Sequence, residues 1–176
     1  NDSQTPMPGF RIIVNSLSSK AADTIVAGPK GMFYLNNIPD GNYVISGTTD
    51  QNWGWGGVNA TDALFSMRHF VELDTLMLVR LLAGDVNSSQ QVNSSDALLI
   101  AQRFSGIIQS FIRGNWVMAP DTIVLSGGTL FSKQFSVLCV GDVNGSYNPF
   151  LKAAAVNGLL SSTEVSLNAG SEIRVP

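Results

Sequence analysis

The chain is poor in charged side chains and has a single cysteine, and each shortage excludes a class of function. Charged residues make up 13% of its 176 residues, and the formal net charge is -3. Nucleic-acid binding needs clustered lysine and arginine, so the lack of any basic run argues against it. Cys139 cannot form an internal disulfide, and within the apolar run 135–139 we expect it to be a buried hydrophobic side chain.

Long apolar runs and catalytic motifs are also missing. No apolar stretch approaches the roughly 20 residues that cross a membrane. Residues 1–9 lack the basic-then-apolar pattern of a secretion signal, so we expect a cut made inside a longer polypeptide. There is no nucleophile elbow, phosphate-binding loop or zinc-ligand spacing. The one histidine, His69, is expected on a helix surface in water, where the repeat described below has Arg103. We therefore predict that the chain is not an enzyme.

The polar and apolar residues that are present favour a β-rich extracellular module. Hydrophobic residues account for 44% of the chain, enough for a real core, and Asn, Ser, Thr and Gly supply most of the polar surface. Short apolar runs predict strands at 10–14, 24–27, 31–35 and 43–45. The turn chemistry of Pro39–Asn42 joins the last two of these strands.

The spacing of glycine, aromatic and apolar residues around this turn resembles the closing hairpin of prealbumin-like domains of the carboxypeptidase-regulatory kind. The matching residues are Gly31, Phe33, Leu35, Ile38, Pro39, Gly41 and Tyr43. The resemblance covers about forty residues. It implies a small antiparallel β-sandwich in residues 1–49.

Residues 50–116 change character and contain an internal repeat. Apolar spacing predicts helices at 61–73 and 95–104, and residues 58–64 align with 92–98 in both polar and apolar positions. We place the helix N-terminal caps at Thr61, Asp62, Ser95 and Asp96. Core packing does not explain a repeat that is this exact in its polar residues.

The polar loop before the second helix has the ligand spacing of a calcium site. Calcium takes six to eight oxygen ligands, and a loop supplies them from its first, third, fifth, seventh, ninth and twelfth places. These places hold Asp85, Asn87, Ser89, the Gln91 carbonyl, Asn93 and Asp96. Val92 is expected to pack inward, whereas Gln90 replaces the usual glycine at the sixth place. The loop therefore predicts Ca2+ as the cofactor. Because it has only two carboxylates, we expect weak binding, for which millimolar extracellular calcium would suffice.

Two further motifs each supply only part of such a loop. Asn59 and Asp62 form an intact back half, but a front half at Asp50 and Asn52 makes the loop one residue too long. A good front half consists of Asp142, Asn144 and Ser146, with no ligand side chain at its ninth and twelfth places. Two hypotheses remain open, with one to three ions in all. Either the halves at 142–146 and 59–62 complete one composite site, or residues 50–62 form a single 13-residue loop.

The calcium spacing together with the duplicated helix resembles the type I dockerin repeat, with its EF-hand-like loops. Segments 55–63 and 141–147 are similar to dockerin-like parts of secreted multimodular bacterial proteins, and the likeness covers most of residues 31–150. The resemblance implies calcium binding and a secreted or cell-surface location in bacteria. It also implies the setting of cohesin–dockerin assemblies in polysaccharide degradation.

The predicted class is α+β, with a small β-sandwich at 1–49, a dockerin-like helical pair at 50–116 and a β extension at 117–176. Strands are expected at 122–125, 135–140 and 171–175 within the extension. The expected function is a monomeric structural and assembly module in which calcium locks the helical pair to flanking β segments and domains of the same polypeptide.

Two other functions remain open. The first is a true dockerin that binds a cohesin on another polypeptide. Dockerins carry a polar recognition pair early in each helix, whereas this chain has Ala63-Leu64 and Ala97-Leu98, which fit internal packing better. The second is a carbohydrate-binding module that uses Trp53, Trp55 and Trp116. We expect packing rather than sugar stacking for these three rings.

Overall fold

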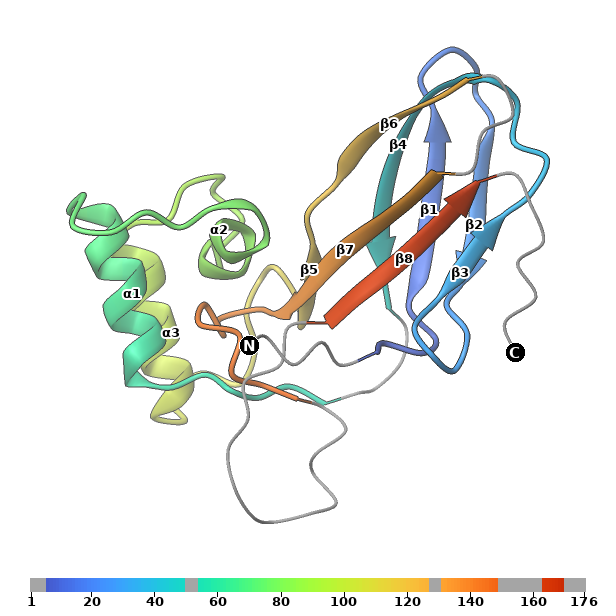
Figure 1. The fold of residues 1–176 in the computed structure, drawn as a ribbon. Helices are drawn as coiled ribbons and strands as arrows, with labels where there is room; N and C mark the ends of the chain where they lie inside the picture. Colours follow the sequence, from blue (N-terminus) through green and yellow to red (C-terminus); the bar gives the residue numbers. More distant parts are fainter. Residues whose placement is uncertain (1–5, 50–53, 127–130, 149–162, 170–176) are drawn as a thin grey trace. The chain divides into compact units, whose positions relative to one another are not determined.

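The computed structural model describes residues 6–49, 54–126, 131–148 and 163–169, which form a mixed α+β protein (Figure 1). The predicted α+β class is confirmed. The elements in chain order are β1 (Arg11–Ser16), β2 (Ala22–Val26), β3 (Phe33–Leu35), β4 (Gly41–Thr48), α1 (Ala60–Phe70), α2 (Leu78–Gly84), α3 (Ser94–Phe104), β5 (Trp116–Met118), β6 (Asp121–Leu125), β7 (Phe131–Cys139) and β8 (Thr163–Ala169).

The chain divides into two compact units that each draw on separate parts of the sequence. The helical unit lies within 52–119 and 137–162, and the β unit lies within 6–51, 120–136 and 163–176. This division differs from the three consecutive segments expected from the sequence. The reason is strand pairing, because β6 from the C-terminal half pairs with β4 from the N-terminal half.

The first sheet of the β unit has the strand order β2-β1-β4-β6 and is antiparallel throughout. Alternating burial along β1, with Ile12 and Val14 inside and Arg11 exposed, is the pattern of a strand with one solvated face. The turn before β4 is closed by the Tyr43 hydroxyl, which donates to the Pro39 carbonyl oxygen at 2.8 Å. The strands predicted in residues 10–49 are therefore confirmed, with ends shifted by a few residues.

The second sheet has the order β3-β8-β7-β5 and contains pairings that the sequence did not indicate. β3 pairs with β8 in parallel, unlike the purely antiparallel arrangement we expected. β7 continues into the helical unit, where its last residues pair with β5, Trp116 opposite Cys139. β5, β8 and the short helix α2 were not predicted, because each is too short or too polar to show a clear period. The strand expected at 171–175 lies outside the described residues.

Both long helices begin one residue earlier than predicted, and their caps differ from the predicted ones. Asn59 and Asn93 are the N-caps, and each accepts a hydrogen bond from the backbone N–H two residues later. Asp62 and Asp96 lie three residues after these caps, and each carboxylate accepts a hydrogen bond from the backbone N–H of its cap residue. This arrangement is a capping box at the start of each helix. No helix in the described part of the chain is long and apolar enough to cross a membrane.

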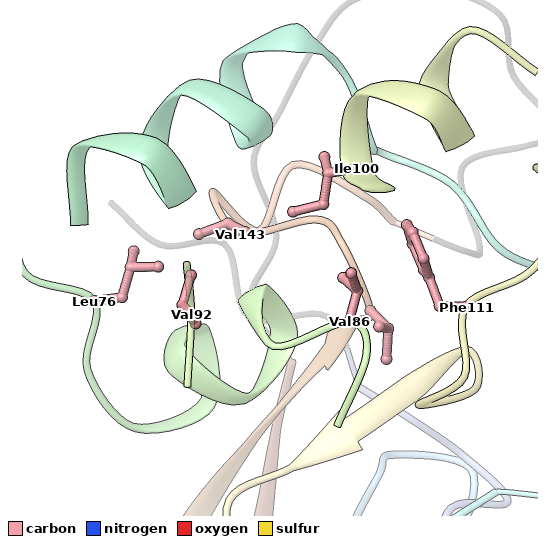
Figure 2. Close-up of a cluster of buried hydrophobic side chains, with 7 residues drawn as sticks. Leu76, Val86, Val92, Ile100, Phe111 and Val143 are labelled. Carbon is pink, nitrogen blue, oxygen red and sulfur yellow. The ribbon is translucent and has the colours of Figure 1, made fainter. Parts of the chain in front are cut away.

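A cluster of buried apolar side chains holds the polar loops of the helical unit in place (Figure 2). Its members are Leu76, Val86, Val92, Ile100, Phe111, Val140 and Val143. Val86 and Val92 belong to the loop before α3, and Val143 belongs to the polar segment 142–146. Val92 therefore packs inward as predicted. Burying a valine contributes roughly 1.5–3 kcal/mol, so the core fixes both polar segments against the helices.

Candidate metal centres

The loop 85–96 folds around its own oxygen atoms. Asp85 accepts bonds on both carboxylate oxygens, from Ser89 N to Oδ1 at 2.8 Å and from Gln90 N to Oδ2 at 3.0 Å. The Ser89 hydroxyl donates to the Gln91 carbonyl oxygen at 3.1 Å. From the far end of the loop, Asp96 Oδ1 accepts from Asn87 N at 3.3 Å. All six predicted ligand residues therefore lie in one cluster, which we name the loop centre.

A second cluster has the same hydrogen bonds but is assembled from two distant segments. Ser146 N donates to Asp142 Oδ1 at 2.9 Å, and Tyr147 N donates to Asp142 Oδ2 at 2.7 Å. Asn144 N reaches across 82 positions of sequence to donate to Asp62 Oδ1 at 3.0 Å. We name this cluster the composite centre. The contacts that the composite hypothesis requires between segments 142–146 and 59–62 are present.

The composite centre contains one candidate ligand oxygen that was not predicted, the Gly57 carbonyl. The Ser146 hydroxyl donates to the Gly57 carbonyl oxygen at 3.2 Å, as Ser89 does to Gln91 in the loop centre. Gly57 precedes Asn59 by two positions, as Gln91 precedes Asn93, so the internal repeat held a signal for it. Extending the repeat alignment one residue beyond Val58 and Val92 would have found this carbonyl.

The alternative front half of the first loop is not placed by the structure. Asp50 and Asn52 lie outside the described residues, so the 13-residue loop remains an untested hypothesis. The described part of that loop is shared with the composite centre, because Asn59 caps α1 and Asp62 accepts from the segment at 142–146.

The carboxylates of both centres are buried, and burial opposes their negative charge. Burial raises the pKa of Asp62 to about 6, backbone N–H groups of Asn144 and Asn59 oppose this rise, and the nearby Asp142 adds to it. Burial also raises the pKa of Asp142 and of Asp96. Two buried carboxylates side by side are costly without a positive charge between them, and a divalent cation supplies that charge.

The donor atoms of both centres are oxygens, a set that suits hard cations better than zinc. Among the residues that the structure describes, no three His, Cys, Asp or Glu side chains gather in one place. Each centre instead brings two carboxylates together with side-chain amide, hydroxyl and backbone carbonyl oxygens. Hard oxygen donors of this kind, with few charges, are the set that calcium takes, whereas zinc prefers nitrogen and sulfur.

The tryptophans of the described region are anchored by hydrogen bonds to the backbone. Trp55 Nε1 donates to the Val140 carbonyl oxygen at 2.9 Å, and Trp116 Nε1 donates to the Gly54 carbonyl oxygen at 3.2 Å. Trp55 also packs edge-on against Phe111, with ring centroids 5.8 Å apart. Both rings are half-buried, which gives no support to a sugar-stacking platform, and Trp53 lies outside the described residues.

His69 and Cys139 each have a structural role. His69 Nδ1 accepts a hydrogen bond from Leu76 N at 3.2 Å, so this half-buried ring joins α1 to the segment before α2. We had expected a solvated side chain at this position. Cys139 is a buried free cysteine, which confirms the prediction, and burial raises the pKa of its thiol to about 12.

Of the apolar pairs early in the two long helices, the leucines are exposed, contrary to expectation. Leu64 is 55% exposed and Leu98 is 58% exposed. Their alanine neighbours Ala63 and Ala97 are the ones that turn inward. Since successive helix residues point about 100° apart, only one member of each pair faces the core.

Gln90 adopts a left-handed backbone conformation at the sixth place of the loop centre, with φ +70°. A side chain in this conformation costs about 1–2 kcal/mol, which glycine does not incur. We expect Gln90→Gly to raise the free energy of unfolding by about 1 kcal/mol in urea titrations. Gln91→Gly is the matched control, because the neighbouring residue has no positive φ and should lose stability. A Gln90→Gly protein no more stable than the parent would contradict the strain at this position.

The chain was compared with protein-family models, with curated proteins and with solved structures, and no match was found. The resemblance to dockerins therefore remains a prediction from the residues. What the loop centre and the composite centre can bind is inferred from their own donor atoms, their burial and their charge.

Proposed function

We propose that this chain is a non-catalytic, calcium-stabilised structural module of a secreted or cell-surface bacterial protein. One calcium ion belongs to the loop centre and a second to the composite centre. The observation that carries the proposal is the matching hydrogen-bond pattern of the two centres, one contiguous and one built from segments about 80 residues apart. The repeated residues therefore form the same hydrogen bonds in one contiguous loop and in a pair of distant segments.

The residues present fit a calcium ion in each centre. The loop centre would use Asp85, Asn87, Ser89, the Gln91 carbonyl, Asn93 and Asp96. The composite centre would use Asp142, Asn144, Ser146, the Gly57 carbonyl, Asn59 and Asp62. When bound, the ion supplies a positive charge to buried carboxylates. The side chains of Asn59 and Asn93 also cap α1 and α3, so each would share its oxygen between the helix cap and the ion.

Calcium in the composite centre would hold the segment after β7 to the start of α1. Without the ion, that connection depends on hydrogen bonds such as Asn144 to Asp62 and on the burial of Val143. This is the role expected of an assembly module, whose partners are flanking domains of the same polypeptide. The finer fold that we propose is a dockerin-like helical pair next to a prealbumin-like sandwich. Buried side chains contributed by both sheets, such as Ile12 and Phe33, support the sandwich.

Calcium binding to the chelator-treated protein tests the proposal directly. We expect two ions per chain by isothermal titration calorimetry, and a higher melting temperature in millimolar calcium than in chelator. A ligand that binds only the folded state stabilises it by about 2.7 kcal/mol at a concentration one hundred times its Kd. Magnesium at the same concentration is the control, because it demands a tighter octahedral site. No bound calcium and an unchanged melting temperature would refute the proposal.

A second candidate function is docking onto another polypeptide, as the resemblance to dockerins implies. Three pairs of repeat-equivalent apolar side chains are about half exposed or more, namely Leu64 with Leu98, Phe70 with Phe104, and Leu73 with Ile107. Exposed apolar patches mark interaction surfaces in many proteins. Calcium-dependent binding of a cohesin that is lost in Leu98→Asp would favour this candidate, and the exposed Leu17→Asp in the β unit is a matched control.

A further inference from the structure

Arg113 forms an ion pair with the first ligand residue of the loop centre. Its guanidinium Nη1 contacts the Asp85 carboxylate at Oδ2 and also donates to the Asp85 backbone carbonyl oxygen at 2.9 Å. Arg113 N donates to the Val86 carbonyl oxygen at 3.2 Å, which fixes the position of the backbone. The cation is therefore held in place by main-chain and side-chain contacts.

The ion pair uses one carboxylate oxygen of Asp85, and the other oxygen contacts the Ser89 hydroxyl. Asp85 Oδ1 lies 3.5 Å from the Ser89 hydroxyl, which itself lies 3.1 Å from the Gln91 carbonyl oxygen. Oδ2 instead accepts from Gln90 N and from Arg113. Arg113 thus contacts Oδ2 and leaves Oδ1 beside the Ser89 hydroxyl.

In the part of the chain that the structure describes, the corresponding oxygen of the composite centre is bordered by backbone and not by a cation. Asp142 Oδ2 accepts from Tyr147 N at 2.7 Å. The backbone of Gly57 approaches this oxygen closely, because a Cβ added to Gly57 would lie only 2.7 Å from it. Within the described ranges no ion pair reaches Asp62 or Asp142. Counting side-chain charges, the composite centre carries -2, whereas the loop centre with Arg113 carries -1.

We propose that Arg113 weakens calcium binding at the loop centre while keeping that loop folded before calcium arrives, so that the composite centre fills first. This inference rests on the proposed function. The attraction of a divalent cation scales with the charge it meets, so removing half of the net negative charge weakens binding by roughly tenfold or more. In the absence of calcium, the same guanidinium compensates the buried Asp85 and stabilises the loop.

Substitution of Arg113 separates this role from ordinary structural support. In Arg113→Gln, we expect the weaker of the two calcium affinities to rise about tenfold while the stoichiometry stays at two. The melting temperature in chelator is expected to fall, because Asp85 loses its counterion. Arg113 and Asp85 line a cavity of about 140 Å3, so the glutamine of Arg113→Gln, which is shorter than arginine, can be accommodated there. A residue that merely held the fold would lower stability and calcium affinity together.

Calorimetric titration of four further proteins makes the test decisive. Arg113→Lys keeps the charge and should leave the two affinities separated. Asp142→Ala leaves only the loop centre and Asp96→Ala leaves only the composite centre, so the wild-type constants can be assigned. The Asp142→Ala/Arg113→Gln double variant should bind its one ion more tightly than Asp142→Ala alone.

Each outcome of these titrations decides a different claim. Two bound ions with unchanged or weaker affinity in Arg113→Gln would overturn the inference and leave the proposed function intact. A loop centre that binds more tightly than the composite centre in the single-centre proteins would also overturn it, even if Arg113→Gln fails to fold. No calcium binding by the wild-type chain would overturn the proposed function, and this inference with it.

Discussion

Replacement of Asp142 by alanine is expected to reduce the calcium bound from two ions per chain to one. The Asp142 carboxylate is buried and accepts from Ser146 N, the Ser146 hydroxyl and Tyr147 N, so it organises the whole front half of the composite centre. Its loss removes one of two carboxylates and releases the segment from Asp62. Stabilisation by calcium should fall by about 2.7 kcal/mol at a concentration one hundred times the Kd of that site.

Calorimetry and thermal melting in calcium check this result, with Asp121→Ala as the control. Asp121 lies in the β unit and pairs with Lys133 near the surface, so its removal should leave both ions bound. Asp62→Ala should abolish the same ion as Asp142→Ala, and the double variant should lose nothing more. If Asp142→Ala still binds two ions, the composite centre is refuted, and the loop that begins at Asp50 becomes the better hypothesis.

Gly57→Ala is expected to destabilise the protein by about 3 kcal/mol and to abolish the composite centre. Gly57 has φ +79°, a conformation that costs a residue with a side chain about 1–2 kcal/mol. The added Cβ would also lie 2.7 Å from the Asp142 carboxylate and 2.6 Å from Tyr147 Cβ, closer than such atoms approach. Overpacking of this kind adds typically 1–3 kcal/mol. Urea unfolding in chelator measures the stability, and calorimetry counts the ions.

Gly106→Ala separates the two causes, because it shares the backbone strain without the close contact. Gly106 also has φ +79°, but nothing lies within 4 Å of the place where its Cβ would stand. It should lose only about 1–2 kcal/mol and keep both calcium ions. Equal losses in the two variants, with calcium binding intact in both, would show that Gly57 does not approach Asp142 closely.

Local patterns were sufficient for the elements that begin with a distinct signal. α1 and α3 were found within a few residues because each starts with an Asn-x-x-Asp capping box followed by a helical apolar period. β1 and β4 alternate buried and more exposed residues, and a Pro-Asp-Gly turn precedes β4. The helix α2 was missed because its apolar run has no capping side chain at Met77. Burial of Val79, Ala83 and Gly84 stabilises this helix, and no local signal identifies it.

The sequence by itself determined which oxygens each polar segment offers, because ligand spacing within a loop follows the local period of the backbone. The sequence left the pairing of segment 142–146 with 59–62 as one of two hypotheses, and it marked the Gly57 carbonyl only through the register of the repeat; the tertiary structure brought these groups together. Tertiary packing also placed Arg113 against Asp85 and left Leu64 on the surface. Such pairings depend on how the apolar core, with Val86 and Val143 inside it, brings remote segments together, and loop spacing contains no information about that.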